Sequence, residues 1–534
     1  MKRFLSLVLA AVLALCALPA MAESAAPTKL TVLTTSKDDL SADYSMKKVA
    51  EKCNVEFEWV YLVEDTAKEK FQIMVNANEL PDIILRPDAL AGDANQAYAL
   101  GVDSVFLDLI PAMEKYAPDM MALYQGYTDV WNACVGPNGA LYILPRINED
   151  RDFTSNGVRT YIDRTWLKNV DMEMPTTLDE FYNVLVAFKE KDANGNGDPN
   201  DEIPWTFDKG TNVMDGLVMT AFTEITQGDT RIIRDGKVQI AAMTEAYREA
   251  LRFMNKCFSE GLIYAESFTQ DSNTVWALNE KSADVNTLGV VTGGHRNCVC
   301  NWDSRRWESY DQIFVLFDEN GETHPSVKLG NNFGRNVALN ANITDEKLEA
   351  AMRVLEYIAS EEGSFLVRVG ELGYNVQPAD EGGLAIGGEK AYYRKNTEEE
   401  DEKLVVNGKI TMTNDWNWIM RLEQSYQQAA ADANPGDDWT YVHITMENKY
   451  YHIYVKDIGL YWPTTMIMDA EAVNEMALIQ TEMKNYISSA TTDFITGKRN
   501  VDTDWDAYLA DLNKIQVEKF LTISQEQYDK GTPR

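Results

Sequence analysis

Residues 29–85 read KLTVLTTSKDDLSADYSMKKVAEKCNVEFEWVYLVEDTAKEKFQIMVNANELPDIIL, and the order of their hydrophobic patterns decides the fold. Three runs have the apolar or alternating pattern of β-strands, and two stretches between them have the spacing of amphipathic helices. The strands are expected at 29–35, 55–62 and 80–85, and the helices at 44–53 and 66–78. This alternation favours a parallel, doubly wound sheet, which is an α/β architecture.

Amphipathic helices recur in the rest of the chain. The segment TTLDEFYNVLVAFKEK (176–191) opens with Thr177 and Glu180 in the relation of a capping box, and TEAYREALRFMNKCFSEGL (244–262) stops at Gly261. A third helix (344–363) is expected after the extended stretch NVALNAN. The apolar stripes of the first two helices are Leu178, Phe181, Leu185 and Phe188, and Tyr247, Leu251, Met254 and Phe258. Strands and helices therefore alternate in both halves of the chain.

The N-terminus, MKRFLSLVLAAVLALCALPAMAES, has the three parts of a secretory signal. Lys2 and Arg3 precede an apolar stretch, and the small-x-small ending at Ala20 to Ala22 marks a cleavage site. Cleavage as a lipoprotein at Cys16 is the alternative, because a lipid on that thiol would tether the protein to the membrane. Since Leu15 stands where lipoprotein signals have a small residue, cleavage after Ala22 and a secreted protein are favoured.

The length of the mature chain indicates two lobes. About 510 residues follow the signal, which are too many for one hydrophobic core. We find no internal repeat, no low-complexity linker and no later stretch of about 18 apolar residues that would span a membrane. The acidic tract TEEEDEK (397–403) is interpreted as a solvated loop. Two lobes without a disordered linker predict a chain that crosses between them more than once.

The charge of the chain excludes several classes of partner. The formal net charge is -35, and it becomes -37 once Lys2 and Arg3 are removed with the signal. Such a field repels nucleic acid and anionic membrane surfaces, so neither is expected as a partner. A local basic pocket could still accept an anionic small ligand. The 12 Trp and 25 Tyr residues offer aromatic surface for packing and for ligand contacts.

Cysteine usage argues against a fold built on disulfides. Of the six cysteines, Cys16 lies in the signal, and the remaining five are an odd and sparse set. The segment HRNCVC (295–300) offers an imidazole and two thiols that could hold zinc or copper. The other histidines have no spacing that supplies a fourth ligand. We therefore expect Cys298 and Cys300 to be free thiols or to form a local disulfide.

The segment DANGNGDPNDEIP (192–204) has the composition of a cation-binding loop. Acidic and amide side chains alternate with glycines, so the backbone can curl and direct several oxygens to one point. Six or seven hard oxygens from a flexible loop suit Ca²⁺. Because the protein would supply every oxygen, a structural ion is expected. The expected ligands are Asp192, Asn194, Asn196, Asp198 through its carbonyl, Asp201 and Glu202.

Two alternatives bear on this loop. An EF-hand would place its closing Glu one position after Glu202 and continue into a helix, whereas Ile203 and Pro204 follow here. A calcium loop of another kind is therefore expected. The second alternative is an Asx-rich turn that binds no ion.

The neighbourhood of the loop resembles a known family. IDRTWLKNVDMEMPTTLDEFYNVLVAFKEKDANGNGDPNDEIP (162–204) is similar to the signature region of the extracellular solute-binding proteins of ABC importers, in the subgroup of alginate-oligosaccharide-binding and LplA-like receptors. That subgroup shows a W-L…P-T-T-L-D-E-F block followed by a calcium loop. Further matches lie at 79–85, 139–149, 253–269 and 495–530, so the resemblance spans nearly the whole mature chain in order. One extra residue after Asp198 leaves open which of Asn200, Asp201 and Glu202 bind the ion.

The resemblance implies a two-lobed, type II periplasmic-binding-protein-like fold in which each lobe is a doubly wound sheet. We expect an N-terminal lobe from 28–155 plus about 336–385, and a C-terminal lobe from about 156–335 plus about 386–534. The lobes would close over a ligand and present the closed form to ABC transporter permease subunits. A monomeric receptor without catalytic activity is implied, with Ca²⁺ as a structural ion.

Ligands of α/β sheets bind outside the carboxyl ends of the strands. This rule favours Ser36 and Lys37 after the first strand, and Asp82 and Arg86 around the third. Asp82 could equally cap a helix or hold a turn, and Arg86 could be a surface residue.

Tryptophans are the other candidates, because indole rings stack on the apolar faces of sugars. The resemblance implies ligand-binding tryptophans in these regions, because family members that bind oligosaccharides have indoles there. Each tryptophan of this chain could equally be a packing residue. The set is Trp276, Trp302, Trp307, Trp416 and Trp418.

The predicted function is capture of an oligosaccharide, neutral or cationic as first choice because of the acidic field. Uronate oligosaccharides and peptides are the next choices. A secreted polysaccharide-active enzyme is an alternative, since two carboxylates suffice for glycoside hydrolysis. The sequence has no GxSxG, HExxH or phosphate-loop motif. A sensor subunit that contacts a histidine kinase is the third reading.

Overall fold

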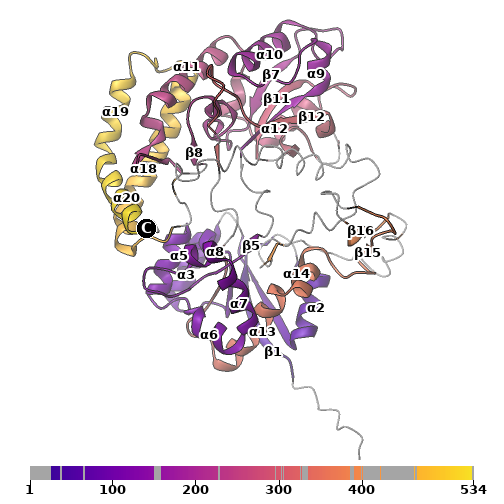
Figure 1. The fold of residues 1–534 in the computed structure, drawn as a ribbon, viewed down its shortest axis with the longest axis vertical. Helices are drawn as coiled ribbons and strands as arrows, with labels where there is room; N and C mark the ends of the chain where they lie inside the picture. The colour runs from indigo at the N-terminus through magenta and orange to yellow at the C-terminus, as the bar shows by residue number, and fades with distance from the viewer. Residues whose placement is uncertain are drawn as a thin grey trace, which may run out of the picture.

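The computed structural model describes residues 26–531 with gaps. The gaps are 37–38, 64–65, 149–157, 227–228, 295, 302–303, 305, 325, 328–334, 385–389, 398–399, 401–420, 423–461 and 463–465. The described chain forms two α/β lobes (Figure 1). We call N-lobe the unit built on the sheet β2-β1-β3-β14-β4, and C-lobe the unit built on the sheet β12-β6-β11-β7.

The N-lobe sheet begins with the strands expected from the sequence. β1 (Thr28–Thr34) lies between β2 (Val55–Tyr61) and β3 (Ile83–Leu85) and is parallel to both. β14 (Arg335–Leu339) is antiparallel to β3, and β4 (Leu144–Pro145) is antiparallel to β14. Since β14 follows the C-lobe strands in the chain, the polypeptide returns to the N-lobe to complete this sheet.

Side chains of the N-lobe sheet are buried on both faces. Leu33 and Ile84 point into one core, under Phe71 of α3, whereas Leu30 and Val32 belong to the core on the other face. Each fully buried side chain of this size contributes on the order of 2 kcal/mol. The helices of this lobe are α2 (Tyr44–Cys53), α3 (Ala67–Ala77), α4 (Pro87–Ala91), α5 (Ala94–Val102), α6 (Leu109–Tyr116), α7 (Pro118–Gly126), α8 (Thr128–Cys134), α13 (Asp345–Ala359) and α14 (Glu361–Arg368).

The helix expected at 344–363 is two helices, because α13 ends and α14 begins around Ser360. Ser360 has extended backbone angles and accepts a hydrogen bond from the Gly363 N–H at 3.1 Å, so it is the N-cap of α14. A Cβ atom on Gly363 would lie 1.8 Å from the Tyr357 carbonyl oxygen, so only glycine permits this close joint. The chain then continues into a hairpin of β15 (Val376–Pro378) and β16 (Tyr393–Lys395).

The C-lobe sheet is mixed. β7 (Ile203–Phe207) and β11 (Leu288–Gly293) are parallel, and β6 (Arg159–Asp163) runs antiparallel to β11 and to β12 (Tyr310–Ile313). β6 directly follows the passage from the N-lobe, and its first residue, Arg159, pairs with Gly293 at the end of β11. The chain therefore enters this sheet at the edge where its parallel strands end.

Helices cover the C-lobe sheet as the apolar stripes predict. Thr177 and Glu180 form the expected capping box of α10 (Leu178–Glu190), and Phe181 and Phe188 are buried. The other helices are α9 (Arg164–Asn169), α11 (Glu245–Ser259), α12 (Ser272–Asn279), α18 (Ala470–Ile495), α19 (Trp505–Lys514) and α20 (Val517–Gly531). Short strands complete the lobe or connect it: β5 (Ile147–Asn148), β8 (Ile225–Thr226), β9 (Arg231–Arg234), β10 (Lys237–Ile240), β13 (Ser326–Val327) and β17 (Arg421–Leu422).

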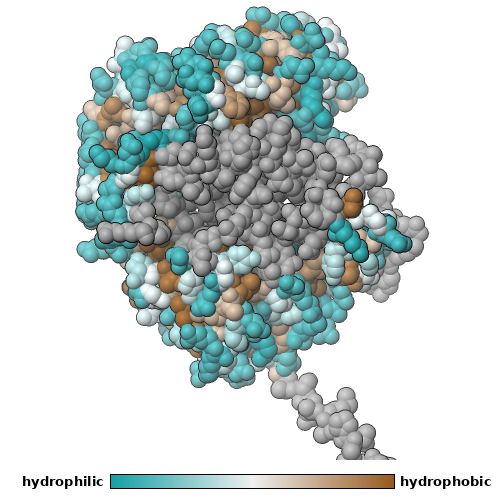
Figure 2. Space-filling model, in the orientation of Figure 1, coloured by the Kyte–Doolittle hydropathy of each residue, from teal (hydrophilic) through white to brown (hydrophobic). Residues whose placement is uncertain are grey.

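Helix α18 also links the two lobes. It packs with α11 and α20 of the C-lobe, and its N-terminal part contacts α5 of the N-lobe (Figure 1). At this contact the Met468 N–H donates to Asn95 Oδ1 at 2.8 Å. Figure 2 shows that the face in view, outside the grey residues, is mostly hydrophilic and has hydrophobic patches on both lobes. In the part of the chain that the structure describes, no helix has the length and apolarity needed to cross a membrane.

Candidate functional site

The carboxyl ends of the parallel strands lie where the chain passes between the lobes. In the N-lobe, β14 enters beside the end of β3, where Val337 pairs with Leu85. In the C-lobe, β6 enters beside the end of β11, where Arg159 pairs with Gly293. Both edges are therefore attached to crossing segments, and each is the edge at which α/β sheets bind ligands.

Ser36 and Arg86 follow the carboxyl ends of β1 and β3. The Ser36 N–H donates to Thr34 Oγ1 at 3.1 Å. Arg86 has a left-handed backbone (φ 53°), and its N–H donates to the Asn336 carbonyl at 2.8 Å. Its partly exposed guanidinium lies 3.6 Å from Asp88 Oδ1. Lys37 lies outside the described residues.

Asp82 stands at the other end of β3. Its Oδ2 accepts hydrogen bonds from the N–H and the hydroxyl of Thr31, each at 2.8 Å, and lies 2.7 Å from Lys347 Nζ. The residue is buried, with an exposed fraction of 8%. These bonds hold β1, β3 and α13 together within the N-lobe, while the predicted ligand role stays a prediction.

An arginine that the sequence analysis did not single out adds positive charge beside Arg86. Arg146 lies between β4 and β5, close to the end of β3 in the sheet order. Burial lowers the pKa of Arg146 to about 10, and the neighbouring charges of Arg86 and Arg368 act in the same direction. Arg86, Arg146 and Arg368 thus lie near one another at this edge, with Asp88 as a nearby opposite charge.

A pocket of about 470 Å³ opens where β7 ends, between residues 207–215 and α18. Its apolar lining includes Phe207, Phe268 and Ile487, of which Phe268 is partly exposed and the other two are buried. The polar groups come from two distant parts of the chain, so no local motif could indicate them. They include Asp208, Asn212, Asp215, Asp229, Lys484, Asn485 and Ser488.

Two of the carboxylates in this pocket are already held by the protein. Asp208 accepts hydrogen bonds from the Gly210 N–H and the Ser272 hydroxyl, both at 2.8 Å. Asp229 forms a buried ion pair with Arg231 at 2.6 Å, and although burial opposes its ionisation, that pair lowers the pKa of Asp229. The pocket therefore combines aromatic surface with exposed amide and hydroxyl groups.

The described tryptophans among the candidates make contacts within the C-lobe. Trp276 is partly buried, and its indole N–H donates to the Asn297 carbonyl at 2.8 Å. Trp307 is buried beside Tyr310, with the Arg296 guanidinium 5.3 Å from the ring centroid. The remaining three candidates lie outside the described residues: Trp302, Trp416 and Trp418.

The acidic loop 192–202 is folded back on itself. Gly195 (φ 77°) and Gly197 (φ 95°) adopt left-handed angles that let it curl. The side-chain amides of Asn194 and Asn196 donate to the two oxygens of Asp201, each at 2.8 Å. Further bonds join Gly197 N–H to Asp192 Oδ2 (2.9 Å), Asp198 N–H to Asn196 Oδ1 (2.8 Å), Asn200 N–H to Asp198 Oδ1 (3.2 Å) and Ala193 N–H to Glu202 Oε1 (3.1 Å).

Two carboxylate oxygens in the loop have no hydrogen-bond partner. Asp192 Oδ1 and Glu202 Oε2 are buried and unsatisfied, and burial raises the pKa of Glu202. An unsatisfied buried carboxylate oxygen is costly, so the loop has the chemistry to accept a cation. Across the described ranges, no three acidic, histidine or cysteine side chains gather closely enough to hold a metal by themselves. A cation here would also need amide or carbonyl oxygens.

The five described cysteines are free thiols. For Cys298 and Cys300 this confirms the expectation of free thiols and not the alternative of a local disulfide. Four of the five are buried. Burial raises the pKa of Cys53 to about 11 and that of Cys257 to about 12. The thiols of Cys53 and Cys257 are therefore protonated near neutral pH. His295 lies outside the described residues.

Comparison with known proteins gives relatives along nearly the whole chain. The fructooligosaccharide ABC transporter substrate-binding protein FusA of Streptococcus pneumoniae is 26% identical over 517 residues, which cover 93% of this chain and 88% of FusA. Lipoprotein LipO of Bacillus subtilis is 26% identical over 71% of this chain and 74% of its own. No protein-family model matches the chain.

Solved structures share the fold. An extracellular solute-binding protein from Bifidobacterium longum subsp. infantis superposes with a TM-score of 0.75 at 19% identity, over 95% of this chain and 99% of its own. The FusA EF-hand mutant in complex with fructo-nystose gives 0.71 at 23% identity, over 94% and 99% of the two chains. The alginate-binding protein AlgQ2 without calcium ion gives 0.66 at 18% identity, over 95% and 99%. The comparisons thus confirm the resemblance that the motifs indicated. The chain has the two-lobed fold of the extracellular solute-binding proteins of ABC transporters, and its sequence is similar to theirs.

Proposed function

We propose that this protein is the substrate-binding receptor of an ABC importer, and that it captures an extracellular oligosaccharide between its two lobes. The observation that carries the proposal is the similarity to a fructooligosaccharide receptor along 93% of the chain. The two carboxyl edges, both attached to crossing segments, support it from the structure. Contacts of one sugar with both edges would stabilise the closed arrangement of the lobes and so shift their equilibrium towards it.

A neutral oligosaccharide is the proposed ligand class. The chain carries a formal charge of -35, which disfavours polyanions except where arginines gather. The pocket after β7 offers aromatic surface with exposed amide and hydroxyl groups, which is the mixture that sugar rings require. Arg86 and Arg146 at the N-lobe edge can donate to sugar hydroxyls without selecting a charged ligand. Ser36, Asp82 and the five tryptophans remain proposed ligand contacts.

The proposed lobe boundaries follow the two large sheets, whereas the hairpin β15–β16 has one strand on each side of the boundary at about 386. We propose 28–155 plus about 336–385 for the N-terminal lobe, because β14 and α13 pack on β1 and β3. The second lobe would comprise about 156–335 plus about 386–534, since α18, α19 and α20 share the C-lobe core with α10 and α11. The crossings between these units would provide the hinge for closure.

The loop 192–202 is proposed to bind a structural Ca²⁺. Its ligands would be drawn from Asp192, Asn194, Asn196, the Asp198 carbonyl, Asp201 and Glu202, and the two unsatisfied carboxylate oxygens support this assignment. The ion would offset the negative charge that the carboxylates of this loop carry. Two structural neighbours, an EF-hand mutant of FusA and AlgQ2 without calcium ion, indicate that calcium matters among proteins of this fold.

Export by the N-terminal signal and work at the outer surface or in the periplasm are part of the same proposal. The signal region, including Cys16, lies outside the described residues. We expect a monomer that delivers its sugar to the importer's permease subunits. The relatives are binding proteins, which favours capture over catalysis.

A thermal-shift screen tests the proposed function. The mature protein, in calcium, is heated with neutral oligosaccharides such as kestose, with uronate oligosaccharides and with short peptides. A ligand that binds only the folded state adds about 2.7 kcal/mol at a hundredfold excess over its Kd. The expected result is a shift with a neutral oligosaccharide that is recovered intact. Hydrolysis of that sugar would favour the alternative of a polysaccharide-active enzyme. An unchanged melting temperature with every ligand of the panel would overturn the proposal.

A further inference from the structure

One carboxylate of the C-lobe pocket is held in a fixed orientation by a buried arginine. Asp229 lines the pocket, and its side chain is 9% exposed. Arg231 donates three hydrogen bonds to this carboxylate. Its backbone N–H and its Nε–H reach Asp229 Oδ1 at 2.9 and 2.8 Å, and an Nη2–H reaches Oδ2 at 2.6 Å. One guanidinium thus orients both oxygens in a bidentate arrangement.

The arginine is fixed in turn by later parts of the C-lobe. Arg231 begins β9 and is 5% exposed, and its guanidinium carbon lies 3.8 Å from the centroid of the Trp462 ring and 5.3 Å from that of Phe520. An Nη1–H donates to Ser524 Oγ at 3.4 Å. Stacking on rings and a planar fork of donors restrict a guanidinium strongly. The position of Asp229 in the pocket therefore depends on the packing of α20 and Trp462 behind it.

Asp229 keeps its negative charge in this place. Although burial opposes its ionisation, the charge and hydrogen bonds of Arg231 and the charge of Lys484 lower the pKa of Asp229. The ion pair of Asp229 and Arg231 is neutral as a whole. Oδ2 accepts one of the three bonds from Arg231, and a carboxylate oxygen can accept two. The pair can therefore take a hydrogen bond from a neutral donor in the pocket, such as a hydroxyl.

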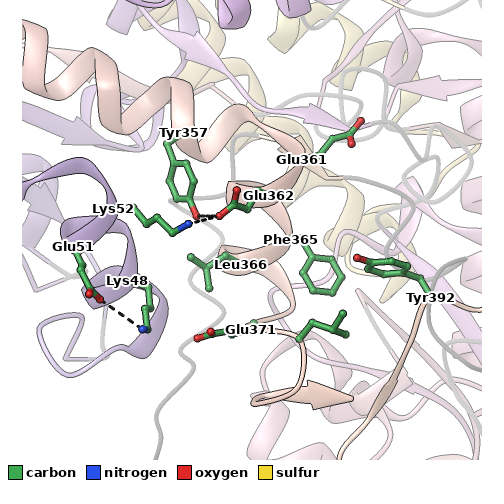
Figure 3. A pocket seen from close by; sticks show the side chains of 12 residues that line it. Lys48, Glu51, Lys52, Tyr357, Glu361, Glu362, Phe365, Leu366, Glu371 and Tyr392 are labelled. Atoms are coloured by element: carbon green, nitrogen blue, oxygen red, sulfur yellow. Dashed lines mark hydrogen bonds and ion pairs between the residues drawn. The ribbon is translucent and has the colours of Figure 1, made fainter. Parts of the chain in front are cut away.

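The larger pocket of the N-lobe, about 780 Å³ in volume, has charged groups of a different kind (Figure 3). Two of its ion pairs are Lys52 with Glu362 at 2.7 Å and Lys48 with Glu51 at 3.6 Å. These four side chains are between 37% and 75% exposed, so solvent screens them and their geometry is loosely held. The buried pair in the C-lobe pocket is instead organised before a ligand arrives, which lowers the entropic cost of binding.

We propose that Asp229 determines which sugars the C-lobe pocket accepts, by taking a hydrogen bond from a ligand hydroxyl at Oδ2, and that Arg231 is the positioning residue that holds this acceptor. The inference rests on the proposed function, from which it takes the sugar. Because the pair is neutral as a whole, it suits a hydroxyl better than a charged group. A sugar that lacks this hydroxyl would leave the fixed carboxylate oxygen unsatisfied and would bind less tightly.

Asp229→Asn tests the acceptor with almost no change in volume. The amide oxygen can replace Oδ1 and keep its two bonds, but the NH₂ group then replaces Oδ2 and donates where the ligand also donates. Wild type and variant are titrated calorimetrically with the neutral trisaccharides kestose and maltotriose. The affinity for a trisaccharide that the wild type binds should fall by at least about tenfold. A variant whose affinity stays within about twofold of the wild type would overturn the inference.

The matched control breaks another carboxylate–arginine pair of the same strand. Glu224 pairs with Arg234 at the other end of β9, with side chains 13% and 27% exposed, and it does not belong to the described lining of the pocket. Glu224→Gln should lower the melting temperature, as Asp229→Asn should, but should leave sugar affinity within about twofold. An equal loss of affinity in both variants would make the effect one of stability and would refute the specificity role.

The positioning role of Arg231 has a readout in the pH dependence of binding. In the wild type Asp229 stays ionised, so sugar affinity should be constant from about pH 8 to about pH 5. In Arg231→Gln, burial should raise the pKa of Asp229, so affinity should fall as the pH decreases. Arg231→Lys keeps the positive charge and should restore the constant profile at a lower affinity. A constant profile in Arg231→Gln would refute the positioning role.

The other titratable groups of the pocket are the same in these proteins, so their effects cancel in the comparison. The described ones are Asp208, Lys209, Asp215, Tyr247 and Lys484. Failure of the inference can be distinguished from failure of the proposed function. If the wild type binds sugar and Asp229→Asn binds it equally well, only the inference fails. If the wild type binds neither trisaccharide and no other neutral oligosaccharide of the thermal-shift screen, the proposed ligand class fails and the inference fails with it.

Discussion

Asp82 and Lys347 form an ion pair of 2.7 Å between the start of β3 and helix α13, although 265 positions separate them in the chain. The same carboxylate accepts two hydrogen bonds from Thr31 of β1. One buried side chain thus connects the first and third strands of the N-lobe to a helix that follows the C-lobe. This pair therefore helps to hold α13, which follows the C-lobe strands in the chain, against the N-lobe sheet.

Replacement of Asp82 by Ala should destabilise the protein by about 2–4 kcal/mol, because three donors lose their acceptor in a buried place. Chemical denaturation monitored by circular dichroism measures the loss. Lys347→Ala should cost less, since the lysine is one-third exposed and its departure leaves the Thr31 bonds intact. Equal stability of Asp82→Ala and the wild type would contradict this role.

Calcium removal should lower the melting temperature if loop 192–202 holds the ion. Burial raises the pKa of Glu202, so without the ion the folded state binds a proton more tightly than the unfolded state. In the calcium-free protein, Glu202 then contributes to stability below its ordinary pKa, and this contribution is lost as the pH rises through its raised, folded-state pKa. The decrease in melting temperature that EDTA causes should therefore be larger at pH 7 than at pH 5.

The matched variants for the loop are Asp192→Asn and Glu202→Gln, with the exposed Asp284→Asn as control. The first two should no longer respond to calcium, and the control should respond as the wild type. A melting curve unchanged by excess EDTA, from protein that contains no metal, would refute the calcium site.

The pair Glu224 and His324 predicts a pH-dependent contribution to stability. The hydrogen bond to Glu224 raises the pKa of His324 above 6.5, against the opposing effect of burial. Because the raised pKa belongs to the folded state, the stabilisation is complete below pH 6.5 and is lost as pH rises through the folded value. His324→Gln should remove about 1 kcal/mol at pH 6 and much less at pH 9. A constant difference across this range would contradict the ion pair.

The C-lobe pocket after β7 should be sensitive to a bulky side chain at Ser488. Ser488 lines the pocket, whereas its exposed neighbour Ser489 lies outside it on the same helix. Ser488→Leu should weaken oligosaccharide binding by about tenfold or more, which is about 1.4 kcal/mol, and Ser489→Leu should leave it unchanged. Equal affinities of both variants in calorimetric titrations would exclude this pocket from the sugar site.

Local patterns predicted much of the fold because the relevant forces are local. The capping box of Thr177 and Glu180 and the apolar face of α10 are both readable from spacing. The division of the third helix at Ser360 was not predicted, because it depends on the approach of Gly363 to the Tyr357 carbonyl. No periodicity in the sequence signals such a backbone contact.

The candidate site was less accessible to sequence reasoning. Asp82 was selected by its place near a strand, but the strand begins at Ile83, so Asp82 lies at the amino end. Tertiary packing alone brings Asp208 and Ser488 together in the pocket, and Arg86 and Arg146 together at the N-lobe edge. Their positions in the sequence do not indicate this proximity. The alternation of Asp, Asn and Gly in 192–202 could be interpreted as a cation-binding loop from sequence because a single short loop would supply all of the oxygens.

The most direct measurement is a calorimetric titration of the mature, calcium-loaded protein with the oligosaccharide that gives the largest thermal shift. Capture between two lobes predicts one sugar bound per chain, with the sugar recovered intact after the titration. Absence of binding heat, a stoichiometry other than one, or hydrolysis of the sugar would contradict the account of this protein as a receptor.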